Sequence, residues 1–147
     1  MRCVIGLMFD PTYSRVVLIR KTHPTWQAGL LNAPGGKIEP DEFSTAAIDR
    51  EFEEETGLKV ANIWTHFLDL KLTQDDGELY CFFTTGNVDA AKTVTDEEIV
   101  VMDVREVMDR CDTIPSLRWL IQMARSFPFG EHSLKFSAQE VPVVSIK

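Results

Sequence analysis

The sequence predicts an α/β fold in which helices flank a mixed central sheet, an α/β sandwich. Strand-like runs outnumber helix-like runs, they occur in adjacent pairs, and one long helix interrupts them early in the chain. The chain has 147 residues, of which 44% are hydrophobic, so it can bury roughly two-thirds of its unfolded surface around one core. We therefore expect a single domain over residues 1–147.

The first two strands are predicted at residues 2–9 and 15–20, because both runs are rich in residues that favour strands. Residues 10–14 between them include the Asp, Pro and Ser typical of turns, so the two strands should form a hairpin. Residues 21–37 are rich in Gly and Pro and show no sustained period. We expect a loop there, and a loop of this length is often functional.

After this loop the sequence predicts one long helix and then shorter elements. The helix covers residues 42–56, with Asp41 as its N-terminal cap and Gly57 in the left-handed conformation that ends many helices. An Asp-Gly pair predicts a second hairpin further along the chain. The remaining elements are strands at 60–73, 78–85 and 98–104, helices at 105–110 and 116–126, and an edge strand at 141–144.

The negative charge of the chain is concentrated in one short segment. Residues 39–55 hold eight acidic residues and one basic residue, a net charge of −7 out of −8 for the whole chain. The rest is nearly neutral and leaves no basic face for polymeric nucleic acid or for an anionic membrane. No apolar run approaches the ~20 residues of a membrane span, and no secretory signal pattern is present. We therefore expect a cytoplasmic protein.

The cysteines and histidines give no sign of a disulfide or a zinc site. The three cysteines are widely separated and odd in number, so we expect reduced thiols. The three histidines lack the spacing of metal ligands. These residues are Cys3, Cys81, Cys111, His23, His66 and His132.

Three carboxylates of the predicted helix share one face, because Glu51, Glu54 and Glu55 fall within an arc of about 100°. They repel one another and lie near the negative end of the helix dipole. A solvated acidic face is one interpretation. The other is a site for a hard divalent cation such as Mg²⁺, which would make the same cluster favourable.

This segment resembles the motif of a known family. Gly36, Glu42 and the run from Arg50 to Leu58 resemble the Nudix box, Gly-x5-Glu-x7-Arg-Glu-U-x-Glu-Glu-x-Gly-U, in which U is a bulky apolar residue. The stretch Leu31–Lys37 is similar to that of MutT-like members, which cleave oxidised purine nucleoside triphosphates. The resemblance implies the Nudix fold with its loop-helix-loop catalytic motif. It also implies hydrolysis of a nucleoside diphosphate linked to another group, with Mg²⁺ or Mn²⁺ as cofactor.

The resemblance assigns roles to residues of the box. Arg50 is expected to orient a glutamate of the catalytic helix, and Glu42 and Gly57 to support the geometry of the motif. The expected metal ligands are the carbonyl of Gly35 and the carboxylates of Glu51, Glu54 and Glu55, of which Glu51 and Glu54 are also expected to be catalytic.

The proton acceptor of the reaction is expected either in the box or in a later loop. Glu97 and Glu98 precede or open the strand at 98–104 and are the candidates in that loop, with Glu97 preferred. The alternative is that both are ordinary solvated charges at the end of a strand.

Residues outside the box are expected to bind the substrate. Asn32 would read the edge of a purine through its amide, Trp26 would stack on the base, and Lys21 would contact phosphate. Gly36 and Lys37 belong to the same substrate-binding stretch. The alternatives are a turn-forming Asn32, a Trp26 that packs within the loop, and a Lys21 that is simply an exposed charge.

One segment departs from the resemblance. The human-type oxidised-purine enzyme carries Trp-Pro-Asp-Asp before its last helix, and these acids contact the base. The corresponding residues here, Ile114–Leu117, contain neither acid, and the spacing of nearby Asp112 does not match. A preference for 8-oxoguanine is therefore not predicted.

Three functions follow from these observations. The leading one is Mg²⁺-dependent hydrolysis of a nucleoside triphosphate, including damaged or non-standard ones, to monophosphate and pyrophosphate. The second keeps the chemistry but takes ADP-ribose or another nucleotide sugar. The third is a non-catalytic module that senses nucleotides, although such modules usually lose glutamates of the box. In each case the partner is a small nucleotide, and the protein is expected to be a monomer or homodimer.

Overall fold

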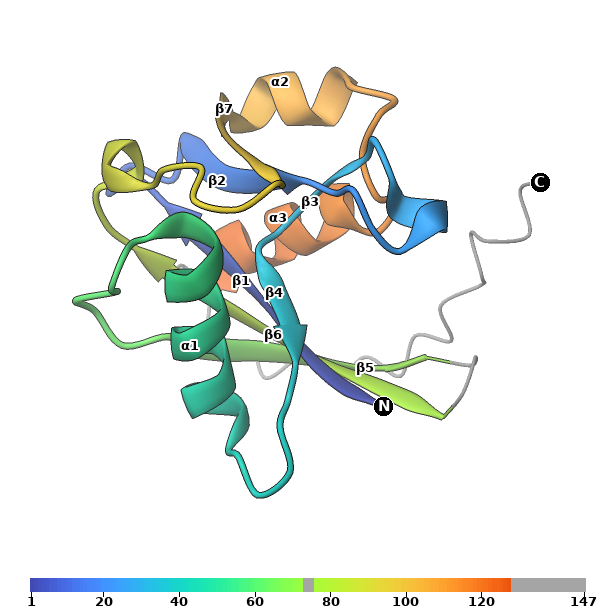
Figure 1. Ribbon diagram of the computed structural model, residues 1–147. Helices are drawn as coiled ribbons and strands as arrows, with labels where there is room; N and C mark the ends of the chain where they lie inside the picture. The colour runs from blue at the N-terminus through green and yellow to red at the C-terminus, as the bar shows by residue number, and fades with distance from the viewer. Residues whose placement is uncertain (73–75, 128–147) are drawn as a thin grey trace.

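The computed structural model describes residues 1–72 and 76–127, which form a mixed seven-stranded sheet with helices on both faces (Figure 1). The predicted α/β sandwich is confirmed. The strands are β1 (Arg2–Phe9), β2 (Arg15–Arg20), β3 (Leu31–Asn32), β4 (Gly35–Lys37), β5 (Thr65–Leu72), β6 (Gly77–Thr85) and β7 (Glu98–Asp103). The helices are α1 (Ser44–Thr56), α2 (Val104–Asp109) and α3 (Leu117–Ser126), with 3-10 turns η1 (Thr25–Gln27) and η2 (Val88–Ala90).

Strand β1 is the centre of the sheet. It runs parallel to β6 along its whole length, and β6 pairs antiparallel with β5, as the second predicted hairpin requires. On the other side, β2 pairs antiparallel with β7 over its full length. The sheet is therefore mixed, because the β1 and β6 pair is parallel while the other neighbours are antiparallel.

Strands β1 and β2 separate soon after their turn. Their antiparallel register joins Phe9 to Val16, and beyond this point each strand takes a different partner. Strand β3 pairs with the end of β2, and β4 pairs with the first half of β1. The segment predicted as a loop, 21–37, thus contains two short strands and η1. The prediction was wrong there because the partners are backbone groups of β1 and β2, which the local sequence does not reveal.

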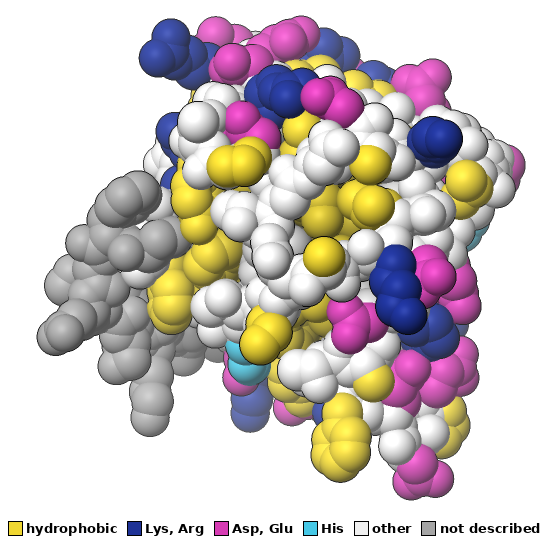
Figure 2. All heavy atoms as spheres, turned by 90° about the vertical axis from the view of Figure 1, so that its left-hand side faces the viewer, with side chains coloured by type: hydrophobic (Ala, Val, Ile, Leu, Met, Phe, Trp, Pro, Cys, Tyr) yellow, Lys and Arg dark blue, Asp and Glu magenta, His cyan; other side chains and the backbone are white. Residues whose placement is uncertain are grey.

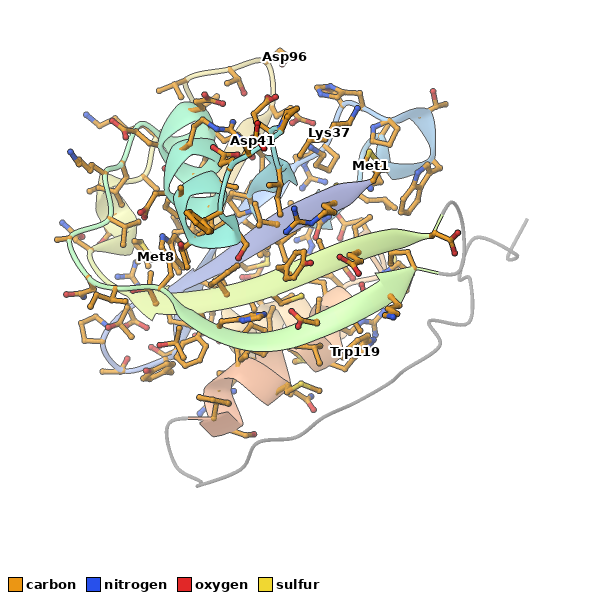
Figure 3. All side chains as sticks on the ribbon, turned by 90° about the horizontal axis from the view of Figure 1, so that it is seen from below. Met1, Met8, Lys37, Asp41, Asp96 and Trp119 are labelled. Atoms are coloured by element: carbon orange, nitrogen blue, oxygen red, sulfur yellow. The ribbon has the colours of Figure 1, made fainter. Side chains whose placement is uncertain are left out.

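The two faces of the sheet carry separate apolar clusters. On β1, Val4 and Met8 pack with Phe52 of α1, whereas Leu7 packs with Leu120 of α3 on the opposite face. Figure 3 shows α1 and α3 on opposite sides of the sheet. Because side chains of a strand alternate between faces, a strand covered on both sides is apolar throughout. Helix α1 therefore packs on one face of the sheet through Phe52, and α3 packs on the other face.

Helix α1 begins later than predicted. Its first residue is Ser44, and Phe43 occupies the cap position without a side-chain cap hydrogen bond. Asp41 has a φ of 62° and lies outside the helix, so the predicted cap was wrong. A capping residue needs an extended backbone, which this left-handed conformation does not provide. Gly57 ends the helix with a φ of 69°, as predicted.

The other boundaries shift by small amounts, apart from β5. That strand begins at Thr65 instead of residue 60. The residues before it connect α1 to the sheet, and the last of them, Trp64, packs on Phe52 of α1. The Trp64 indole N–H donates to Asp49 at 2.9 Å, which gives one acid of the charged segment a structural role. The predicted strand at 141–144 lies outside the described residues.

The remaining structural expectations concern thiols and surface. Cys3 and Cys111 carry free thiols, and Cys81 is buried in the core. Within residues 1–72 and 76–127, no helix is long and apolar enough to cross a membrane. Figure 2 shows Lys and Arg side chains interspersed with Asp and Glu on the face that it presents.

Candidate active site

Two glycines of β4 let the strand lie unusually close to its neighbours. A Cβ atom on Gly35 would lie 2.0 Å from the carbonyl oxygen of Val4, and one on Gly36 would lie 2.4 Å from the carboxyl carbon of Glu51. No larger residue fits at either position without displacement. The Gly-Gly pair therefore allows β1, β4 and the carboxylate of Glu51 on α1 to pack in direct contact.

In the register of β4, the backbone N–H and carbonyl of Gly35 make no hydrogen bond to β1. The Gly6 N–H donates to the Pro34 carbonyl at 2.9 Å, and the Ile38 N–H donates to the Arg2 carbonyl at 2.9 Å. In an antiparallel pair, hydrogen-bonded positions alternate with non-bonded ones. Gly35 lies one position from Pro34, so its N–H and carbonyl both face the opposite edge of the strand.

That opposite edge faces α1. The Gly35 N–H donates to Glu55 Oε2 at 3.4 Å, and the carbonyl of Lys37, two residues further along, accepts from Arg50 Nη2 at 3.0 Å. The same alternation directs the carbonyl of Gly35 towards the helix. Figure 3 shows the labelled Lys37 on the α1 side of the sheet. A carbonyl oxygen and carboxylates therefore face one another across this edge.

Arg50 connects three of the glutamates. Its Nε and Nη2 donate to the two oxygens of Glu42 at 2.8 and 2.9 Å, and its Nη1 donates to Glu51 at 2.8 Å and to Glu54 at 3.4 Å. The hydrogen bonds from Arg50 lower the pKa of Glu42 to about 2 and raise the pKa of the guanidinium itself. Arg50 thus orients Glu51, and Glu42 holds Arg50.

The three box glutamates differ in their exposure to solvent. The side chain of Glu51 is 14% exposed and that of Glu54 is 58% exposed, while Glu55 is half-buried. Among the residues that the structure describes, no three acidic, His or Cys side chains already lie close enough to hold a metal ion. The carboxylates therefore share one side of α1 without forming a closed cluster.

Glu55 is the most perturbed acid of this group. Its pKa is raised to about 8, chiefly by burial and also by the negative charges of Glu51 and Glu97, against the opposing effects of Lys21 and the Gly35 N–H. A half-buried carboxyl among other carboxylates is stabilised either by a proton or by a cation. Carboxylates with an adjacent backbone carbonyl are the oxygen ligands that a hard divalent cation prefers, so these residues fit such an ion.

The structure separates the two candidate proton acceptors. Glu97 is 4% exposed, its Oε1 lies 2.9 Å from Lys21 Nζ, and its Oε2 accepts from the Thr22 N–H at 2.7 Å. Burial would raise the pKa of Glu97, but these donors outweigh it and the pKa is lowered. Glu98 is exposed and lies opposite Arg20. As the residue next to Glu97 in the chain, it points to the other face of the sheet. Of the two, Glu97 is the residue whose charge acts on Glu55. Figure 3 shows its neighbour Asp96 on the α1 side of the sheet.

Asn32 lies on the α1 face of the sheet, because it pairs with Ile19, which lies opposite Ile99, and Ile99 packs against the apolar cluster on the α1 side. Its Oδ1 accepts from the Ala33 N–H at 2.8 Å, as expected of a turn former, while its Nδ2 makes a longer contact of 3.4 Å to Gln27. Trp26, next to Gln27 on η1, is 55% exposed. The indole of Trp26 is therefore exposed, and the Nδ2 of Asn32, which has two N–H groups, keeps donor capacity beyond its long contact with Gln27.

The segment that departs from the family resemblance lies beside Asn32. The Leu31 N–H donates to the Asp112 carbonyl at 2.8 Å, and the Ile114 N–H donates to the Leu31 carbonyl at 2.9 Å. The carboxylate of Asp112 accepts from Arg110 at 2.7 Å and from Arg20 at 3.2 Å, which hold its pKa well below the usual range. Asp112 is thus close to the expected base position but is already paired with two arginines.

The sequence did not reveal the bond between Lys21 and Glu97 or the contact of the Thr22 N–H. One signal was available. Val17, Ile19 and Lys21 are spaced two residues apart along β2 and the residue that follows it, so their side chains point to the same face of the sheet. The pairing of β2 with β7 was not visible in the sequence. Without it, the carboxylate that meets Lys21 could not be identified.

The chain matches the model of the NUDIX domain over residues 1–121. The chain belongs to the NUDIX family. The match extends well beyond the 23 residues of the box, from the first residue of β1 into α3. The expectation of a MutT-like Nudix hydrolase, drawn from the box and from the stretch Leu31–Lys37, is thereby confirmed at the level of the family. No curated protein sequence matches the chain.

Solved Nudix structures share the fold at low sequence identity. A MutT protein from Methanosarcina mazei Go1 is 20% identical with a TM-score of 0.68, covering 88% of this chain and 96% of the other. The NUDIX domain of Shewanella oneidensis NrtR, solved with ADP ribose, is 18% identical with a TM-score of 0.72, covering 87% and 88%. A MutT NUDIX hydrolase from Burkholderia pseudomallei is 16% identical with a TM-score of 0.70, covering 83% and 95%.

Proposed function

We propose that this Nudix protein is a divalent-cation-dependent pyrophosphohydrolase that cleaves a nucleoside triphosphate to its monophosphate and pyrophosphate. The observation that carries the proposal is the packing of β4 on α1, in which Glu51 contacts Gly36 and Glu55 accepts from the Gly35 N–H. This packing presents a carbonyl and several carboxylates along one edge. These carboxylates repel one another in the absence of a cation, and a bound cation removes that repulsion.

Mg²⁺ is the proposed cofactor, and Mn²⁺ can replace it. The residues that would hold it are the carbonyl of Gly35 and the carboxylates of Glu51, Glu54 and Glu55. When bound, the ion neutralises phosphate oxygens and lowers the pKa of a coordinated water. The hydrogen bonds from Arg50 to Glu42 and Glu51 support this assignment, because an orienting partner keeps a ligand carboxylate from turning away.

The proposed reaction transfers a phosphorus atom from one oxygen to another. The oxygen of water forms a bond to phosphorus, the bridging P–O bond breaks, and pyrophosphate leaves with the electrons of that bond. Glu97 accepts the proton of the attacking water, since Lys21 and the Thr22 N–H hold its carboxylate in one orientation and its charge acts on Glu55 of the box. Glu54, which is more exposed, is the alternative acceptor within the box.

The base is proposed to bind over Asn32 and Trp26. The indole of Trp26 offers a partly exposed ring for stacking, and the Nδ2 of Asn32 can donate to an acceptor on the base. Gly36 and Lys37 would flank the phosphates. Lys37 is exposed, and its backbone carbonyl accepts a hydrogen bond from Arg50.

ADP-ribose or a nucleotide sugar is the second candidate substrate. Two observations favour it. The segment Ile114–Leu117 lacks the acids found in the oxidised-purine enzymes. In addition, the structurally similar NrtR domain was solved with ADP ribose. A module that only senses nucleotides is a weaker candidate, because every glutamate of the box is present.

A panel of nucleotides, assayed with Mg²⁺ and with EDTA, tests these functions. Pyrophosphate, detected by a coupled pyrophosphatase, identifies the first function, and a sugar phosphate identifies the second. Binding of a nucleotide without any product would support the sensing module. Turnover that continues at full rate in EDTA would contradict the proposed role of the cation.

A further inference from the structure

The carboxylate of Glu97 is held by two consecutive residues that follow β2. Lys21 Nζ lies 2.9 Å from Oε1, and the Thr22 N–H donates to Oε2 at 2.7 Å. The side chains of Lys21 and Glu97 are only 13% and 5% exposed. Charged side chains are rarely withdrawn from water to this extent unless they are paired, so the pair is a specific feature of the fold.

The sheet brings the two residues together. Strands β2 and β7 pair antiparallel with Ile19 opposite Ile99, and two residues beyond this pair lie Lys21 and Glu97. Both therefore lie on the face of the sheet that α1 covers, as Val17 and Ile99 do. The charge of Lys21 lowers the pKa of Glu55 and the charge of Glu97 raises it, so the pair acts directly on the box.

The Lys21 amino group is poorly placed to exchange the Glu97 carboxylate for a phosphate of the substrate. The backbone N–H of Lys21 donates to the Leu30 carbonyl at 2.9 Å and the Lys21 carbonyl accepts from the Gly29 N–H at 2.8 Å, which fix the backbone from which the side chain extends. If the amino group moved to a phosphate, Glu97 would lose its counter-charge while still buried. Removing one partner of a buried ion pair is strongly unfavourable.

We propose that Lys21 is a positioning residue, which promotes hydrolysis by holding the Glu97 carboxylate beside Glu55 and not by contacting the phosphates of the substrate. The inference rests on the proposed function, in which Glu97 accepts the proton of the attacking water. It replaces the phosphate contact expected of Lys21 from the sequence. The exposed His23, whose Nδ1 lies 3.9 Å from Glu97 Oε2, is a second cationic group close to Glu97 when it is protonated.

Four proteins test the inference: the wild type, Lys21→Met, Glu97→Gln and the double variant. Each is assayed for kcat and KM at saturating Mg²⁺ on the best substrate of the panel. Lys21→Met should lower kcat by roughly ten- to a hundredfold, the usual effect of removing an orienting partner, and leave KM nearly unchanged. The double variant should be no slower than Glu97→Gln, because Lys21 then has no carboxylate to position.

Two further variants separate positioning from loss of charge. Lys21→Arg keeps a cation against Glu97 and should recover much of the kcat. Arg15→Met removes one positive charge from the exposed ion pair with Asp89, which lies on the surface, and should leave kcat and KM unchanged.

Urea unfolding of the same four proteins without metal gives a readout besides activity. If Lys21 and Glu97 form the buried pair, the double variant should shift the midpoint by less than the sum of the two single shifts. Circular dichroism before unfolding identifies any variant that has not folded. Additive shifts would overturn the pairing on which the inference depends.

The outcomes distinguish this inference from the proposed function. A Lys21→Met protein with raised KM and unchanged kcat, or a double variant whose loss equals the product of the single losses, would mean that Lys21 contacts substrate and would overturn the inference alone. A wild-type protein that cleaves no nucleotide of the panel would overturn the proposed function, and the role of Lys21 with it.

Discussion

Glu51 lies against Gly36 so closely that a Cβ atom at position 36 would be 2.4 Å from the carboxyl carbon of Glu51. The same carboxylate accepts from Arg50 at 2.8 Å on its other side. It is therefore held between a glycine that leaves room for it and an arginine that orients it. A carboxylate in this position can be displaced by adding a single methyl group.

Gly36→Ala should displace Glu51 and weaken cation binding, because the methyl group and the carboxylate cannot occupy the same space. We expect a loss of roughly ten- to a hundredfold in the apparent affinity for Mg²⁺, measured from the Mg²⁺ dependence of turnover. Gly86→Ala is the matched control, since its methyl group would meet only the flexible end of Met8 at 3.2 Å. Equal Mg²⁺ dependence in both variants would contradict the role of this contact.

Glu54→Gln should abolish most turnover and leave the fold intact. We expect kcat to fall by about a hundredfold or more, because Glu54 is a proposed metal ligand and the alternative proton acceptor. The melting temperature should stay level or rise slightly, because removing a negative charge from the last turn of α1 is worth roughly 0.3–1 kcal/mol. Glu53→Gln, on the same turn and outside the fixed positions of the box, is the control and should stay active. Near-wild-type hydrolysis by Glu54→Gln at saturating Mg²⁺ would show that the assigned role is wrong.

Glu55 should make the stability of the metal-free protein depend on pH. Its pKa is about 8 in the fold and 4.5 as the ordinary value, so the folded state binds the proton more tightly. The stability is then fully present below about pH 4.5 and declines as the pH rises through about 8. Melting temperatures measured in EDTA should show this decline, and Glu55→Gln should reduce it.

Mg²⁺ provides the complementary measurement at Glu55. A ligand that binds only the folded state stabilises it, so added Mg²⁺ should raise the melting temperature most at the alkaline end of this range. The shift should be much smaller in Glu55→Gln. If the variant and the wild type showed the same pH slope and the same response to Mg²⁺, Glu55 would be neither the titrating group nor a ligand.

Asn32→Ala should reduce discrimination between bases more than it reduces the rate on the best substrate. The side-chain Nδ2 is the donor expected to read the base, whereas the bond from the Ala33 N–H to Oδ1 is local to the end of β3. The measurement is kcat/KM across the nucleotide panel for the wild type and the variant. Equal losses on every nucleotide would instead indicate that Asn32 only shapes the turn.

The sequence alone was sufficient for features that depend on local spacing. The helical spacing of Glu51, Glu54 and Glu55 predicted a shared side of α1, and Gly57 marked its end because only a left-handed residue closes a helix in this way. The box also identified the family, since its fixed residues lie within one continuous segment. The start of α1 was less predictable, because the conformation of Asp41 depends on the turn that leads into it.

Only the tertiary structure decided which residues from distant segments meet. The pairing of β2 with β7 brings Lys21 to Glu97, and the separation of β1 from β2 makes room for β3 and β4. Both depend on backbone hydrogen bonds between segments far apart in the chain, and such bonds leave no periodic signal in either segment. The raised pKa of Glu55 has the same origin, because burial is a property of the packed sheet and helix and not of the residue's neighbours in sequence.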